Sequence, residues 1–253
     1  MKHWTEEVQG QQTKHGFLII HGKTDGPSNP LCSFKDDLAD FSKNNLVDYR
    51  EYAWGYSNPY NTDLLNEMDR ITEAKKNLIS RGATNIHIIS HSLGVTATLL
   101  YMTQVRDISS IIFASPGHNT GADNAQSLTK WSRDKATELL EQSNDEPTYF
   151  VDFNNGAIMP IKCKPSCYIS YFSPDGPGNA RTSANNIGNN NPGLNILLVS
   201  GTEDATQTHV LDICYKPLRP SSKSKFIKKL GYDHVQTMPF ILGYMKEWTD
   251  HLG

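Results

Sequence analysis

The chain has 253 residues, enough to bury the core of one α/β domain, and we treat 1–253 as a single domain that carries one inserted segment. Its 24 Lys and Arg against 27 Asp and Glu give a net charge of -3, which provides no basic field to attract nucleic acid or an anionic membrane. No apolar run approaches the roughly 18 residues that a membrane-spanning helix needs. We therefore expect a soluble protein that neither binds nucleic acid nor crosses a membrane.

The four cysteines, Cys32, Cys163, Cys167 and Cys214, are compatible with disulfides or with free thiols. Cys163 and Cys167 are close enough in the chain for one local bridge, but no paired spacing for zinc is present. We therefore expect no metal and no cofactor. No hydrophobic signal-peptide segment precedes residue 16, which favours a cytoplasmic protein; a periplasmic or secreted one is the alternative if a signal peptide has been removed.

Short apolar segments alternate with helical patterns in the first half of the chain. The first segment closes at Gly22, as a buried strand does where it enters a loop. The expected strands are 16–22, 47–54, 85–90 and 108–114, and the expected helices begin near Ser33 and cover 64–82 and 93–105. This order predicts an α/β fold with a mostly parallel central sheet and helices on both faces.

The alternation stops over residues 116–193. One helix is expected at 125–141, followed by a segment rich in Asn, Gly, Pro and aromatic residues in which we interpret the run 185–191 as a loop. The aromatic content is too high for disorder, so we predict that 116–193 forms a cap or lid. Strands at 195–200 and 225–230, with a helix between them, and a final helix from about Pro239 complete the domain.

The segment Ser90-His91-Ser92-Leu93-Gly94 lies between an expected strand and an expected helix. A sharp turn there would lift Ser92 out of the sheet, and it requires small residues two positions before and after the serine because the strand and helix backbones come close together. Gly94 meets this need, and Ser90 stands where glycine is usual. The context predicts a nucleophilic serine at position 92.

These segments together resemble the α/β-hydrolase superfamily, and the resemblance covers nearly the whole chain. The matching segments are the oxyanion loop at 21–22, the nucleophile turn at 90–94, the acid turn at 201–204 and the histidine loop at 231–234. The order Ser, Asp, His is the order of that superfamily. The resemblance implies an α/β-hydrolase fold with fewer amino-terminal strands, in which Ser92 is the nucleophile, Asp204 the orienting acid and His234 the base.

A serine hydroxyl needs a base within hydrogen-bond reach, and His234 alone among nine histidines follows a late strand and a glycine after the acid. His91 is next to Ser92 in the chain, but a sharp turn would point it away. The backbone N–H groups of Leu93 and Lys23 are the expected oxyanion donors. We assign no role to the side chain of Lys23.

The predicted activity is that of a carboxylesterase-like serine hydrolase, which cleaves small to medium carboxylic esters through an acyl-enzyme. The expected substrate-pocket residues are His21, Trp54, Tyr56, Trp131 and Phe172, although each aromatic side chain could instead pack in the core of the cap. The alternatives are an acyltransferase or thioesterase on the same triad, or a non-catalytic binding protein of this fold. The expected partner is a small ester, and the oligomeric state stays open.

Overall fold

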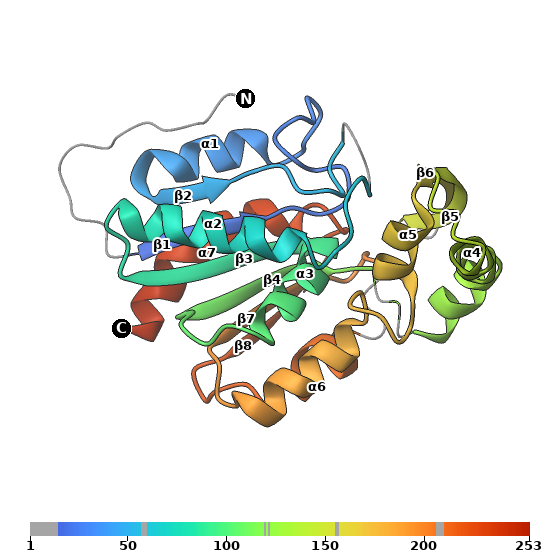
Figure 1. The fold of residues 1–253 in the computed structure, drawn as a ribbon. Helices are drawn as coiled ribbons and strands as arrows, with labels where there is room; N and C mark the ends of the chain where they lie inside the picture. Colours follow the sequence, from blue (N-terminus) through green and yellow to red (C-terminus); the bar gives the residue numbers. More distant parts are fainter. Residues whose placement is uncertain (1–14, 57–59, 119, 121, 155–156, 206–209) are drawn as a thin grey trace.

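The computed structural model describes residues 15–56, 60–118, 120, 122–154, 157–205 and 210–253. A six-stranded sheet forms its centre, with the order β2-β1-β3-β4-β7-β8, and every neighbouring pair of strands is parallel (Figure 1). The strands are β1 (His15–Ile20), β2 (Leu46–Tyr49), β3 (Asn85–Ser92), β4 (Ser110–Pro116), β7 (Ile196–Gly201) and β8 (Lys225–Lys229). The predicted fold class is therefore confirmed.

The inner strands β1, β3, β4 and β7 are buried on both faces, which is why they are almost continuous runs of apolar residues. Side chains next to each other in a strand enter opposite cores: Ile88 packs on one face of the sheet and Ile89 on the other. The edge strand β8 has the sequence KFIKK and is only partly buried. Its lysines discourage pairing with a further strand.

Helices cover both faces of the sheet. On one face lie α1 (Lys35–Asn44) and α7 (Thr237–Leu252), and on the other lie α2 (Glu67–Ser80), α3 (Leu93–Met102) and α6 (Ala180–Asn190). Two short helices, η2 (Leu211–Tyr215) and η3 (Lys216–Leu218), pack against α6. No helix in the described ranges is long and apolar enough to cross a membrane.

A separate group of elements, which we call the lobe, follows β4. It consists of α4 (Asp123–Glu141), the antiparallel strands β5 (Thr148–Asn154) and β6 (Ala157–Cys163), and α5 (Pro165–Phe172). Figure 1 shows the lobe to one side of the parallel sheet. The sequence patterns anticipate α4 but neither the hairpin nor α5. The inserted segment also contains α6, which packs on α3.

Two expectations about secondary structure are wrong. The strand expected at 47–54 ends at Tyr49, because the chain then turns into a loop held by the carboxylate of Glu51, which accepts hydrogen bonds from the backbone N–H groups of Ser28 (2.9 Å) and Tyr56 (3.1 Å). The loop expected at 185–191 is helical as far as Asn190. Burial of Ala184 and the other apolar residues on one face of α6 outweighs the weak helix propensity of asparagine.

All four cysteines are free thiols, so the local bridge considered between Cys163 and Cys167 is not formed. Cys163, Cys167 and Cys214 are buried, and burial raises the pKa of the Cys163 and Cys214 thiols to about 12. These thiols stay protonated at neutral pH and behave as small apolar core groups.

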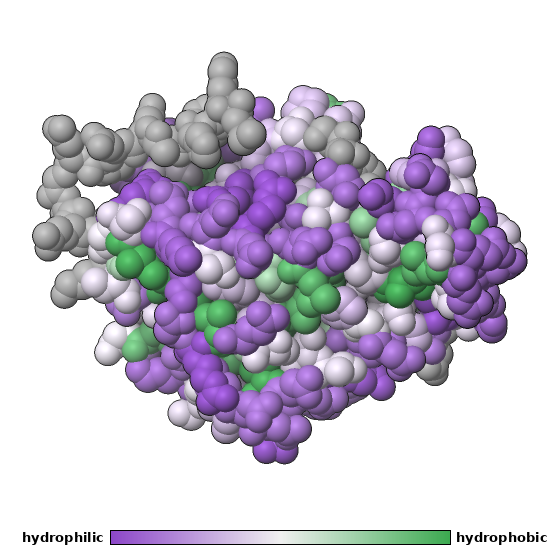
Figure 2. All heavy atoms as spheres, in the orientation of Figure 1, coloured by the Kyte–Doolittle hydropathy of each residue, from purple (hydrophilic) through white to green (hydrophobic). Residues whose placement is uncertain are grey.

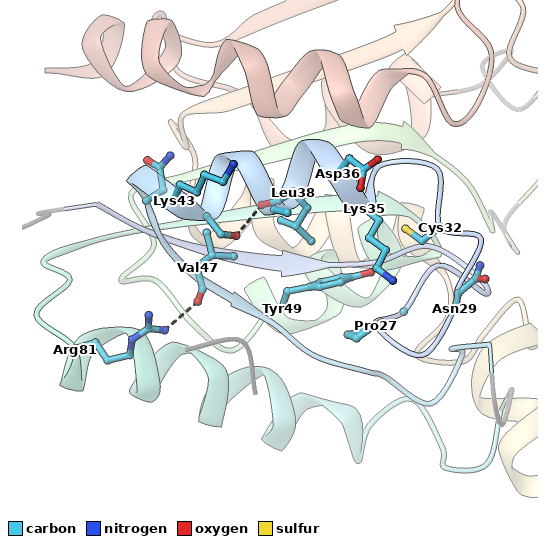
Figure 3. Close-up of a pocket in the computed structure, with 14 residues that line it drawn as sticks. Pro27, Asn29, Cys32, Lys35, Asp36, Leu38, Lys43, Val47, Tyr49 and Arg81 are labelled. Carbon is cyan, nitrogen blue, oxygen red and sulfur yellow. Dashed lines mark hydrogen bonds between the residues drawn. The ribbon is translucent and has the colours of Figure 1, made fainter. Parts of the chain in front are cut away.

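The surface seen in Figure 2 is mostly hydrophilic, with small separate apolar patches. A pocket of about 410 Å³ lies between α1, β2 and the loop that follows β1. Figure 3 shows the residues that line it. Its lining includes Cys32, Leu38, Val47, Tyr49 and Arg81, and contains none of the residues that the sequence predicts for catalysis or substrate binding.

Two glycine variants test how the helices are placed. A Cβ on Gly94 would lie 2.3 Å from the carbonyl oxygen of Ile20 and 2.7 Å from that of His21, so Gly94→Ala should destabilise the protein by about 1–3 kcal/mol. A Cβ on Gly243, within α7, would meet no atom within 4 Å, so Gly243→Ala should stabilise it by about 0.5–1 kcal/mol. Urea unfolding of both variants measures the difference. Equal stability of Gly94→Ala and the wild type would contradict the close contact.

Candidate active site

The predicted catalytic residues all lie at the carboxyl ends of the parallel strands. Ser92 ends β3, Asp204 follows β7 and His234 follows β8. Residues 21–23 follow β1, which is hydrogen-bonded to both β2 and β3. From β1 the chain adds β2 on one side of the sheet and then β3 on the other side, so the direction in which strands are added reverses between β1 and β3. In parallel sheets, ligands bind at the carboxyl ends of the strands next to such a reversal.

Ser92 occupies a sharp turn between β3 and α3. Its backbone has φ 52° and ψ -118°, a left-handed conformation that residues with a Cβ rarely adopt. Such strain costs on the order of 1–3 kcal/mol and is found mainly at functional sites. The turn is possible because Gly94 lets the start of α3 approach the backbone of β1. Ser90 fits in place of glycine because it is small and its hydroxyl points to the carbonyl oxygen of Ile112 (3.4 Å).

His234 and Asp204 form a hydrogen-bonded pair. Nδ1 of His234 lies 3.1 Å from both carboxylate oxygens of Asp204, and the Asp204 side chain is fully buried. Donation from Nδ1–H leaves Nε2 of the imidazole available to accept a proton. Glu203, the neighbouring acid, is exposed, and its backbone N–H donates to the carbonyl oxygen of Tyr232 (2.9 Å).

Ser92 and His234 face a common space beside Gly117. A Cβ built on Gly117 would lie 2.7 Å from Oγ of Ser92 and 3.4 Å from Cε1 of His234. A side chain at position 117 would therefore enter the space between the hydroxyl and the imidazole. Gly117 was not singled out by sequence reasoning, although a glycine directly after a buried strand is a signal that could have identified it.

His91 supports the loop that carries His234. Its Nε2 donates to the backbone carbonyl oxygen of His234 (3.0 Å), and its Nδ1 lies 3.1 Å from a carboxylate oxygen of Asp25. The centroids of the His91 and His234 rings are 5.0 Å apart. Sequence reasoning missed this role, because it depends on partners 66 and 143 positions away in the chain.

The loop after β1 lies against the serine. A Cβ on Gly22 would be 2.9 Å from Cβ of Ser92, so only glycine fits there. His21 holds this loop: its Nδ1–H donates to the carbonyl oxygen of Gly22 (2.6 Å), and its Nε2 accepts from the backbone N–H of Tyr52 (3.0 Å). Burial lowers the pKa of His21, which keeps the ring neutral and preserves both hydrogen bonds. The role of the Lys23 and Leu93 N–H groups as oxyanion donors stays a prediction.

The Lys23 side chain, to which the sequence assigns no role, connects this loop to the lobe. Its ammonium lies 2.5 Å from Oδ1 of Asp152 on β5 and donates to the carbonyl oxygen of Phe153 (2.8 Å). The other carboxylate oxygen of Asp152 accepts from the hydroxyl of Tyr60 (3.0 Å). Both charged side chains are less than 10% exposed, and burial lowers the pKa of Lys23 against the opposing effect of Asp152. The pair is therefore a buried ion pair in which both charged groups also make a further hydrogen bond.

The expected pocket residues occupy different environments. Trp54 and Phe172 are 1% exposed, and Trp54 stacks on Tyr52 with a centroid distance of 5.1 Å. Tyr56 and Trp131 are 51% and 66% exposed. In the described ranges, no group of three or more His, Cys, Asp or Glu side chains is arranged to hold a metal ion.

No family model and no curated protein sequence matches the chain, but solved structures do. One is DcsB in complex with its substrate analogue (TM-score 0.69, 11% identity, covering 95% of this chain and 91% of that one). Another is from a study of the metagenome-derived lipolytic enzymes LipS and LipT (TM-score 0.64, 14% identity, covering 94% of this chain and 94% of that one). A third is the monoacylglycerol lipase of Paleococcus ferrophilus (TM-score 0.64, 12% identity, covering 93% of this chain and 94% of that one). The chain has the α/β-hydrolase fold. At these identities the likeness concerns the fold alone, and the triad stays a prediction.

Removal of the Lys23 ammonium tests the ion pair. Lys23→Met leaves the carboxylate of Asp152 buried without its cation, so we expect a loss of about 3 kcal/mol in the free energy of unfolding. Lys246→Met is the matched control, because Lys246 pairs with Asp250 on the surface and its loss should change stability little. Urea unfolding at neutral pH measures both. If the two variants are equally stable, the buried pair does not hold the lobe to the sheet.

Proposed function

We propose that the protein is a serine hydrolase that cleaves carboxylic esters, with Ser92 as nucleophile, His234 as base and Asp204 as the acid that orients His234. The observation that carries this proposal is the buried Asp204–His234 pair, whose imidazole faces the same space as the hydroxyl of the strained Ser92. The esterases and lipases among the matching structures support ester hydrolysis as the reaction class.

In the proposed mechanism, Nε2 of His234 takes the proton of the Ser92 hydroxyl as Oγ attacks the carbonyl carbon of the ester. The N–H groups of Leu93 and Lys23 stabilise the negative oxygen of the tetrahedral intermediate. The intermediate collapses, the alcohol leaves with the proton from His234, and the acyl group stays on Ser92. A water molecule, deprotonated by His234, then attacks the acyl-enzyme; the bond between the acyl carbon and Oγ of Ser92 breaks, Oγ takes the proton back from His234, and the acid leaves. Asp204 stays ionised throughout.

We further propose that the inserted segment 116–193 provides a cap, with the lobe as its roof. Three observations support this. The segment leaves the sheet at the carboxyl end of β4, the Lys23–Asp152 pair joins the lobe to the loop beside Ser92, and Phe172 of α5 is buried against the ring of His118 (4.8 Å between centroids). A roof of aromatic side chains would exclude water and favour an uncharged acyl or aryl group.

Replacement of Ser92 tests the nucleophile. We expect Ser92→Ala to lower turnover of a p-nitrophenyl ester by about three to six orders of magnitude, because the oxyanion donors and the binding site remain. A fluorophosphonate probe should label the wild type, and mass spectrometry should place the label on Ser92. Ser183→Ala, which changes a buried serine of α6, is the matched control and should be labelled normally. More than a tenth of wild-type turnover in Ser92→Ala would exclude Ser92 as the nucleophile.

A series of p-nitrophenyl esters of graded chain length tests the substrate class. Small to medium acyl groups should react fastest, because a closed aromatic roof limits the length that fits. The outer surface of the lobe exposes Trp131, Tyr149 and Ile158, which is the feature a lipase would use at a lipid surface. Rates that rise steadily with chain length, with activation by lipid droplets, would therefore identify a lipase. Ester formation with an added alcohol acceptor would identify an acyltransferase.

A further inference from the structure

Four buried polar side-chain atoms have no hydrogen-bond partner in the described part of the chain: Tyr52 Oη, His118 Nδ1, Tyr171 Oη and Asn191 Nδ2. The first three belong to one connected group of rings. His118 contacts Tyr171 (centroids 6.4 Å apart), Tyr171 contacts Trp54 (6.3 Å), and Trp54 stacks on Tyr52 (5.1 Å). Since buried polar atoms are almost always hydrogen-bonded, each of these atoms needs a partner that the described chain does not supply.

Of these three residues, His118 is the one that adjoins a residue beside the reacting groups. It follows Gly117, whose missing side chain leaves room for the Ser92 hydroxyl and the His234 ring. His118 is 6% exposed and has φ 55°, in the left-handed region. The hydroxyl of Thr96 points to its carbonyl oxygen (3.3 Å). A strained residue held next to a nucleophile is a candidate for substrate contact.

The hydrogen bonds of His118 determine what its free nitrogen can do. Nε2–H donates to the backbone carbonyl oxygen of Tyr171 (2.8 Å), so Nδ1 of the neutral ring carries a lone pair and no proton. Burial, together with the nearby Lys23 ammonium, holds the pKa of His118 well below its usual range, which keeps the ring neutral. Nδ1 is therefore a buried acceptor that needs a donor.

The surroundings of His118 select the kind of donor. Its ring lies parallel to that of Phe153 (5.8 Å) and edge-on to that of Phe172 (4.8 Å), both from the lobe. The ammonium of Lys23 lies 4.9 Å from the centroid of Phe153 and 5.7 Å from that of Phe172, so a second cation in this space would be repelled. An ionised carboxylate has no proton to donate to Nδ1. A neutral hydroxyl on an otherwise apolar substrate meets all of these conditions.

We propose that His118 is a specificity-determining residue, whose Nδ1 accepts a hydrogen bond from a hydroxyl group of the substrate. The preferred substrates are then hydroxylated esters, with the hydroxyl held beneath the lobe while the ester carbonyl lies at Ser92. This inference rests on the proposed ester hydrolysis and adds the chemical class of the substrate to it.

The test compares pairs of methyl esters that differ by one hydroxyl, on the acyl side in one series and on the alcohol side in another. The wild type should have a kcat/KM about tenfold higher for the hydroxylated member of at least one pair, which is the effect of one hydrogen bond to a neutral group. His118→Phe keeps an aromatic ring between Phe153 and Phe172 but has no acceptor, so it should bring the kcat/KM values for the two members of a pair to the same level.

Two further variants keep the test decisive. His118→Gly adopts the left-handed backbone without strain and has no side-chain acceptor, so it should also lose the preference if His118→Phe folds poorly. His87→Phe is the matched control: His87 is another buried histidine, but its nitrogens lie 2.8 Å from Ser110 Oγ and 2.9 Å from His15 Nδ1. It should keep the wild-type preference. The proposal would be overturned if the wild type had the same kcat/KM for both members of every pair. It would also be overturned if the His118 variants lowered kcat/KM by the same factor for both members of a pair.

Binding separates this inference from the proposed function. Calorimetry with the Ser92→Ala protein measures the affinity for both members of a pair when no turnover occurs. Tighter binding of the hydroxylated ester, lost when His118 is also replaced, supports His118 even if the protein hydrolyses no ester. Equal binding of both members, combined with normal hydrolysis, rejects the role of His118 and leaves the proposed function intact.

Discussion

The close approach of two backbones, the start of α3 and the end of β1, is the constraint on which the candidate site depends. It requires Gly94 on the helix and Gly22 on the loop, since a Cβ at either position would collide with atoms of the facing segment. Through this contact the strained Ser92 and residues 21–23 come together, although about 70 positions separate them in the chain. The energy stored in the turn is offset by the burial of β1 and β3 in the centre of the sheet.

Around this contact, the loops from the other strands are held by side chains that do not react. His91 holds the His234 loop through its backbone carbonyl, and the hydroxyl of Thr237 donates to that of Ser115 (2.9 Å) beneath the same loop. On the other side, the Lys23–Asp152 pair joins the loop after β1 to β5. The orientation of the proposed catalytic groups is therefore determined by packing and hydrogen bonds among loops from five strands, as precise positioning requires.

Much of the fold can be predicted from the sequence because β1, β3, β4 and β7 are buried on both faces and so appear as uninterrupted apolar runs. The pairing of Asp204 with His234 can be anticipated from the glycine-containing turns after β7 and β8. Within the lobe, α4 can be anticipated, but the hairpin and α5 cannot, because they lack a regular apolar period. The same is true of α6, whose asparagines hide the buried face around Ala184. The side-chain roles at Lys23 and His91 depend on distant partners, which no local pattern encodes.

The buried Lys23–Asp152 pair also has a consequence for the strength of the contact between the lobe and the loop after β1. When an apolar contact opens, the exposed surface gains nothing from water, whereas each charge of an ion pair recovers a hydration shell. Hydration therefore offsets part of the attraction that is lost when the lobe separates from the sheet. Dissolved salt screens the hydrated charges and opposes their reunion. The contact between the lobe and the loop after β1 should therefore depend on ionic strength, a property that a purely apolar contact of the same area would lack.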